Sequence, residues 1–146
     1  MKRLFKTAPN KYFYNIMILV VRVTIALFML THGLGKLNLW MSGEPIVFPD
    51  PLGVGDTFSL ALAIFAEVIC SVLLLIGLGT RLVVIPLIIT MIIAVFVIHS
   101  ADGFEKQELG GHYLLAYLLL LVTGGGKYSI DHFISRKMNP RHHYNL

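Results

Sequence analysis

Long apolar runs constrain the fold of this chain more than any other feature of its sequence. They occupy residues 13–31, 58–78, 82–99 and 109–123, and the last reaches span length only if a helix begins near Leu109. A helix of about 20 residues rises roughly 30 Å, which matches the hydrocarbon thickness of a bilayer. The runs therefore predict an all-α fold, a single domain built as a bundle of four transmembrane helices.

The composition favours membrane insertion over every soluble class. Hydrophobic residues make up 56% of the chain and charged residues only 14%, whereas soluble domains carry about 25% charged residues. This balance excludes intrinsic disorder and argues against an ordinary soluble enzyme. The net charge of +4 does not indicate nucleic-acid binding, because no nucleic-acid-binding motif accompanies it. The one cysteine, Cys70, lies in an apolar run, and we interpret it as a small buried hydrophobe.

The charges between the apolar runs predict the orientation of the chain. Basic residues gather in both terminal segments and at Arg81, whereas segments 32–56 and 100–108 are rich in Asp and Glu. Because Lys and Arg are retained on the cytoplasmic side, we expect both termini in the cytoplasm and both acidic loops outside. The first outer loop, 32–56, is long and contains several prolines and glycines. Residues 129–137 predict a short interfacial helix with Asp131 at its N-cap.

Two charged residues interrupt the apolar runs near the predicted middle of the membrane. Arg22 lies in the first run and Glu67 in the second. A lone charge at the centre of a bilayer costs at least ~2.5–3.5 kcal/mol, so such residues seek partners inside the bundle. We therefore predict a buried Arg22–Glu67 pair. The pair either belongs to a polar pocket or proton path, or only fixes two helices in register.

Three histidines, His32, His99 and His112, lie near the predicted outer ends of three different helices. Imidazole ligates copper, zinc or haem iron, and it also donates a hydrogen bond to a quinone carbonyl. With Lys36 and Tyr113 the histidines form a candidate cofactor or substrate site in the outer half of the bundle, with His32, His99 and His112 as candidate metal ligands. The structural alternative is that these histidines cap helix ends, since their spacing matches no local metal motif.

Three blocks of the sequence resemble the DoxX family of small bacterial membrane proteins. The blocks are Arg22, Phe28, Gly33 and Lys36 in the first run, Phe65-Ala66-Glu67 followed by residues 75–81, and residues 124–131, which resemble the family's Gly-Pro-Gly-Arg-Tyr-Ser-Leu-Asp signature. The resemblance implies a four-helix protein of the bacterial inner membrane. It also implies a redox setting, since some members are the small subunit of thiosulfate:quinone oxidoreductase and others associate with redox-defence proteins. The histidine at position 112 departs from the glutamate expected there.

Two hypotheses of different class follow. The first is an accessory subunit of a quinone-linked membrane redox system, with a polar or cofactor site in the outer half of the bundle. The second is a non-catalytic scaffold or assembly partner, and a small-molecule carrier ranks last because no discontinuous central helix is evident. Both hypotheses place the chain in contact with the bilayer and with another subunit or further copies of itself. Neither makes the chain a self-sufficient enzyme.

Overall fold

A computed structural model describes residues 10–138, and every regular element in this range is a helix. In chain order the elements are α1 (Lys11–Met41), α2 (Asp56–Ile64), η1 (Phe65–Cys70), α3 (Ser71–Ile76), α4 (Thr80–Ile93), η2 (Ala94–Ile98), α5 (Phe104–Thr123) and α6 (Ile130–Met138). The segments η1 and η2 are π-helical, and each continues the α-helix before it. The predicted all-α class is therefore confirmed for the described part of the chain.

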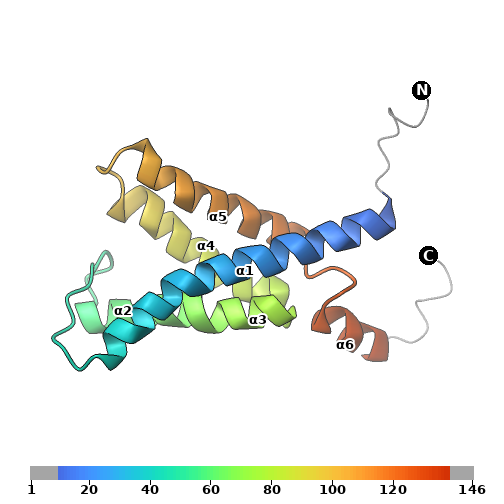
Figure 1. The fold of residues 1–146 in the computed structure, drawn as a ribbon, viewed down its shortest axis with the longest axis horizontal. Helices are drawn as coiled ribbons and strands as arrows, with labels where there is room; N and C mark the ends of the chain where they lie inside the picture. Colours follow the sequence, from blue (N-terminus) through green and yellow to red (C-terminus); the bar gives the residue numbers. More distant parts are fainter. Residues whose placement is uncertain (1–9, 139–146) are drawn as a thin grey trace.

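The helices form a bundle whose two ends differ (Figure 1). The long helix α1 packs along the continuous α2–η1–α3 helix, and α4 pairs with α5. Segments 42–55 and 99–103 connect the helices at one end, which we call the loop end. The short α3–α4 turn and α6 lie at the opposite end, which we call the tail end, where both ends of the described chain also lie.

Three of the helices are long and apolar enough to cross a membrane. They are Lys11–Met41, Asp56–Ile76 and Thr80–Ile98. The fourth predicted span corresponds to α5, which is a helix of 20 residues but does not qualify on composition. Its first turns carry Glu105, Lys106 and Glu108, and these charges lower its mean hydropathy. The structure thus supports three of the four predicted spans.

The first outer loop is shorter than predicted, because α1 does not end near Thr31. It continues to Met41, so His32 and Lys36 are helical residues and not loop residues. The Gly-Leu-Gly sequence at 33–35 looks like the punctuation that ends a helix, but both glycines stay in helical conformation. The prolines of the predicted loop all follow Met41 and lie in segment 42–55.

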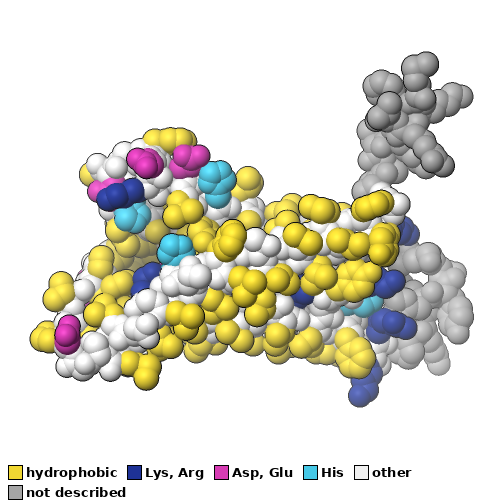
Figure 2. Space-filling view, in the orientation of Figure 1, with side chains coloured by type: hydrophobic (Ala, Val, Ile, Leu, Met, Phe, Trp, Pro, Cys, Tyr) yellow, Lys and Arg dark blue, Asp and Glu magenta, His cyan; other side chains and the backbone are white. Residues whose placement is uncertain are grey.

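The surface of the molecule is divided in the way that a membrane requires. Hydrophobic side chains cover most of the visible flank of the bundle, the visible carboxylates gather at the loop end together with some basic side chains, and the tail end shows Lys and Arg without visible carboxylates (Figure 2). The interior is also apolar. Its buried cluster consists of Ile18, Ala26, Met29, Cys70, Leu74, Val83, Val84, Leu87, Met91, Tyr113, Tyr117 and Leu120. Cys70 is buried, as expected for a structural thiol.

Candidate functional site

A cavity of about 490 Å³ lies at the loop end, between η1, the α4–η2 helix and segment 42–55. Most of its lining side chains are aliphatic, aromatic or proline. The polar exceptions are Lys36, Ser59, Glu67, Thr90 and His99. We call this space the loop-end cavity. It combines an apolar wall with a few polar groups, which is the usual character of a small-molecule site.

The strongest polar feature of the loop-end cavity is an ion pair between α1 and η1. The ammonium of Lys36 donates a hydrogen bond to Glu67 Oε2 at 2.6 Å. The Glu67 side chain is only 4% exposed, whereas that of Lys36 is 26% exposed. Within residues 10–138, Lys36 is the only hydrogen-bond donor to this carboxylate, so Oε1 has no donor from the described chain. A buried carboxylate with one engaged oxygen can still accept a hydrogen bond from a ligand.

Gly33 allows this ion pair to form, a role that was not predicted from the sequence. A Cβ atom at position 33 would lie 2.8 Å from the carbonyl carbon of Glu67 and 2.9 Å from its carbonyl oxygen. The missing side chain thus lets α1 approach the backbone of η1 directly. Gly33 and Lys36 are three residues apart and share a helical face, which is the sequence signal that could have located the contact.

Both π-helical segments contribute to the wall of the loop-end cavity. Glu67 lies in η1, and Ala94 and Ile98 lie in η2. A π-bulge inserts one extra residue into a helix and redirects the side chains that follow it, and such bulges are frequent at functional sites.

The predicted Arg22–Glu67 pair does not form. Both side chains are buried, but Glu67 bonds to Lys36, and Arg22 Nη2 donates to the carbonyl of Tyr128 at 2.7 Å. The reason is that the chain after α5 folds back against the tail end, which places the carbonyl of Tyr128 next to Arg22. The burial of both residues could be predicted from the sequence, but this long-range contact could not.

The three predicted histidine ligands are not brought together. The ring of His32 packs edge-on against Tyr113 with ring centroids 5.9 Å apart, whereas His99 Nδ1 lies 2.8 Å from Asp102 Oδ2. His112 makes neither of these contacts. Over residues 10–138, no three His, Cys, Asp or Glu side chains are grouped so as to hold a metal ion. Of the five predicted site residues, only Lys36 and His99 line the loop-end cavity.

Segment 42–55 covers one side of the cavity and is fixed by a single carboxylate. Asp50 accepts hydrogen bonds from the backbone N–H groups of Val54 and Gly55 and from the hydroxyl of Ser59. These bonds, that of Ser59 first, hold the pKa of Asp50 below its ordinary value. Phe48, which precedes this turn, contributes its ring to the cavity wall.

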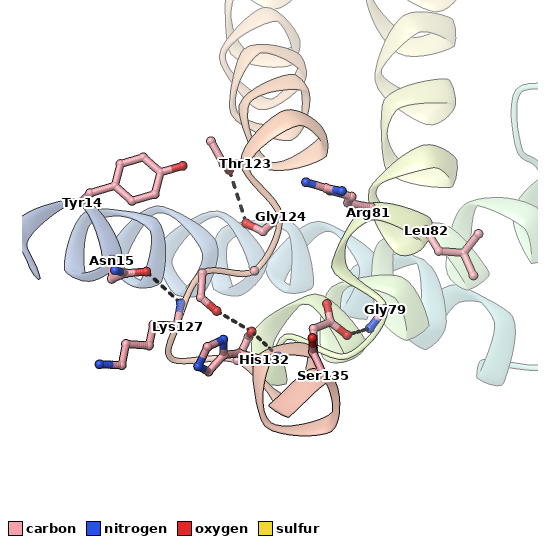
Figure 3. A pocket seen from close by; sticks show the side chains of 14 residues that line it. Tyr14, Asn15, Gly79, Arg81, Leu82, Thr123, Gly124, Lys127, His132 and Ser135 are labelled. Carbon is pink, nitrogen blue, oxygen red and sulfur yellow. Dashed lines mark hydrogen bonds between the residues drawn. The ribbon is translucent and has the colours of Figure 1, made fainter. Parts of the chain in front are cut away.

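Asp131 has a different role from the one predicted. Its two carboxylate oxygens accept hydrogen bonds from the backbone N–H groups of Gly79 and Thr80, at 2.6 and 2.8 Å (Figure 3). Asp131 therefore caps α4 across 51 or 52 residues of sequence. The N-cap of α6 is Ser129, whose hydroxyl accepts from the N–H of His132. A carboxylate at the N-terminus of α4 also interacts favourably with the positive end of the helix dipole.

The blocks of sequence that resemble one family therefore meet in two places. Gly33, Lys36 and Glu67 meet at the loop end, and Arg22, the α3–α4 turn and the segment Tyr128–Asp131 meet at the tail end.

Comparison with known proteins gives the same family. The DoxX family model matches residues 17–100, which is more than half of the chain. An uncharacterised membrane protein of Mycobacterium tuberculosis is 26% identical over 145 residues, covering 82% of each chain. The inner membrane protein YqjF of Escherichia coli is 27% identical over 124 residues, covering 82% of this chain and 93% of its own. No solved structure is a significant match. The chain is thus a membrane protein that belongs to the DoxX family.

Proposed function

We propose that this protein is an accessory subunit of a quinone-linked redox system in the bacterial inner membrane, and that the loop-end cavity holds the quinone. The observation that carries the proposal is the Lys36–Glu67 ion pair in a mostly apolar wall. A bound quinone would carry two electrons and two protons. Its ring and tail are apolar, and its oxygen atoms accept hydrogen bonds when oxidised and donate them when reduced.

The residues of the cavity match both forms of such a molecule. The Lys36 ammonium has donors beyond the one that it gives to Glu67, and these suit a carbonyl oxygen. The second carboxylate oxygen of Glu67 suits a hydroxyl. The aliphatic side chains of α4 and the ring of Phe48 suit the apolar ring and exclude water from it.

Quinone binding is tested with the detergent-purified protein and a short-chain soluble quinone. Trp40 is the only tryptophan and lies in the last turns of α1, one turn beyond Lys36, so its fluorescence reports on the loop end. We expect saturable quenching, and we expect the Glu67→Gln variant to bind about tenfold more weakly because one charged hydrogen bond is lost.

The matched control is Lys106→Gln, which removes a loop-end charge that does not line the cavity. It should bind quinone like the wild type. Quenching that never saturates, or that is the same in all three proteins, would mean that the quinone only partitions into the micelle. The non-catalytic scaffold would then be the better hypothesis.

We also propose that α5 is a fourth span and that both termini lie in the cytoplasm. A helix of 20 residues extends about 30 Å, enough for the hydrocarbon core. Because α5 pairs with α4 and returns the chain to the tail end, residues 10 and 138, the two ends of the described chain, lie at that end, which supports placing both termini on one side. The Lys and Arg side chains at that end favour the cytoplasmic side.

Reporter fusions test this orientation. We expect a fluorescent protein at the C-terminus to be bright, and alkaline phosphatase at the same position to be inactive, because the first matures in the cytoplasm and the second only outside it. The same two fusions made after Asp102 should give the opposite result. A phosphatase active at both positions would exclude the proposed fourth span.

A further inference from the structure

A second cavity lies at the tail end, on the side opposite to the loop-end cavity. It has a volume of about 680 Å³ and is lined by residues from the start of α1, the start of α4, the end of α5 and α6. Tyr14 and Arg81 approach it from opposite sides of Gly124 (Figure 3). We call this space the tail-end cavity. None of the proposed quinone contacts belongs to it.

Two cations line the tail-end cavity, and both have unused donors. Arg81 Nη2 donates to the carbonyl of Val122 at 3.1 Å, which fixes the guanidinium and leaves its other N–H groups without a partner among residues 10–138. The ammonium of Lys127 has no ion-pair partner in the same range, while its backbone N–H is held by Asn15. An anchored guanidinium with free N–H groups is a typical phosphate ligand. Lys127 lines the same cavity but points away from Arg81 (Figure 3), so it adds positive charge at the rim of the cavity.

The carboxylate in this cavity does not cancel the two cations. Asp131 also lines it, but both of its oxygens are engaged by the N–H groups of Gly79 and Thr80. Further positive charge comes from Arg136 and Lys137 in the last turn of α6. The local charge balance therefore favours an anion.

The position of the cavity indicates which anion reaches it. Arg81 is the second residue of the candidate span Thr80–Ile98, so the cavity lies at the boundary between the apolar flank and water. Next to it, Leu82 is 72% exposed and Val122 is 76% exposed on the flanks of α4 and α5. Basic side chains and an exposed apolar surface thus lie side by side, an arrangement that suits a phospholipid better than a free anion.

We propose that the tail-end cavity binds the headgroup phosphate of an anionic phospholipid at the guanidinium of Arg81, with Lys127 as a second cation at the rim of the cavity and the acyl chains along α4 and α5. Basic pockets between transmembrane helices bind anionic lipid headgroups in this way. The proposal needs only the membrane location of the chain and is independent of quinone binding.

Native mass spectrometry of the full chain tests the proposal with phosphatidylglycerol and phosphatidylcholine of identical acyl chains. We expect phosphatidylglycerol to be retained about tenfold more strongly than phosphatidylcholine. Arg81→Gln should remove most of that preference, because it deletes the charged contact to the phosphate, and Lys127→Gln should reduce it, because it removes the cation at the rim of the cavity. Lys127→Gln keeps the experiment decisive if Arg81→Gln disturbs the contact of Arg81 with Val122.

The control is Lys106→Gln, which removes the same charge at the loop end and should leave the preference intact. An equal loss in this variant would show attraction by net charge alone and would overturn the proposal. So would equal retention of the two lipids by the wild type. Displacement of phosphatidylglycerol by millimolar inorganic phosphate would also overturn it, because the cavity would then be a site for a free anion.

Discussion

Replacing Lys36 with methionine is expected to destabilise the protein strongly. The substitution leaves Glu67, whose side chain is 4% exposed, buried without its ion-pair partner. Removing one partner of a buried pair costs about 3–5 kcal/mol, because the remaining charge keeps its desolvation penalty. The Glu67→Gln variant should lose less, since the Lys36 side chain is 26% exposed and its ammonium can reach water or lipid headgroups.

The midpoint of unfolding in a detergent titration measures this asymmetry. The double variant Lys36→Met with Glu67→Gln should regain much of the stability lost in Lys36→Met, because no buried charge remains. The matched control is Lys106→Met, which breaks a pair with Asp102 between side chains that are 62% and 37% exposed. An exposed pair contributes about 0–1 kcal/mol, so this control should change little. Equal losses in Lys36→Met and Glu67→Gln, with no recovery in the double variant, would contradict the buried-charge argument.

The sequence was sufficient to predict three of the spans, because their apolar runs are long enough to cross a membrane, whereas the run in α5 is shorter and is preceded by charged residues. It was also sufficient to predict that Arg22 and Glu67 are buried, since a charge in the middle of such a run must face the interior. It was not sufficient to predict their partners. Arg22 bonds to Tyr128, 106 residues away, and that contact depends on how the chain folds back after α5.

The histidines show a second limit of the sequence. Similar depth on three helices suggested a cluster, but whether side chains converge also depends on how each helix is rotated about its axis. In the structure His32 faces Tyr113, while His99 faces the cavity and Asp102. Lys36 was among the predicted site residues and lines the loop-end cavity, but its partner Glu67 depends on a close approach of two backbones that no local pattern encodes.

Two glycines of α1, Gly33 and Gly35, provide the sharpest test of the close contact between α1 and η1. Gly33 has backbone atoms of Glu67 within 2.9 Å of where a Cβ would lie, whereas Gly35, two residues later, has nothing within 4 Å. Alanine is a better helix former than glycine by about 1 kcal/mol. Gly35→Ala should therefore stabilise the protein or leave it unchanged. Gly33→Ala should destabilise it by about 1–3 kcal/mol despite the same gain in helix propensity, because α1 and η1 must separate.

The same pair of variants links the helix contact to the proposed site. Moving α1 away from η1 separates Lys36 from Glu67, which are now 2.6 Å apart. Gly33→Ala is therefore expected to weaken quinone quenching of Trp40 as well as stability, and Gly35→Ala to preserve both. A Gly33→Ala protein that unfolds at a higher denaturant concentration than the wild type would show that α1 and η1 are not in close contact. If Gly33→Ala lost stability but bound quinone normally, the helix contact would stand and the cavity would not depend on the ion pair.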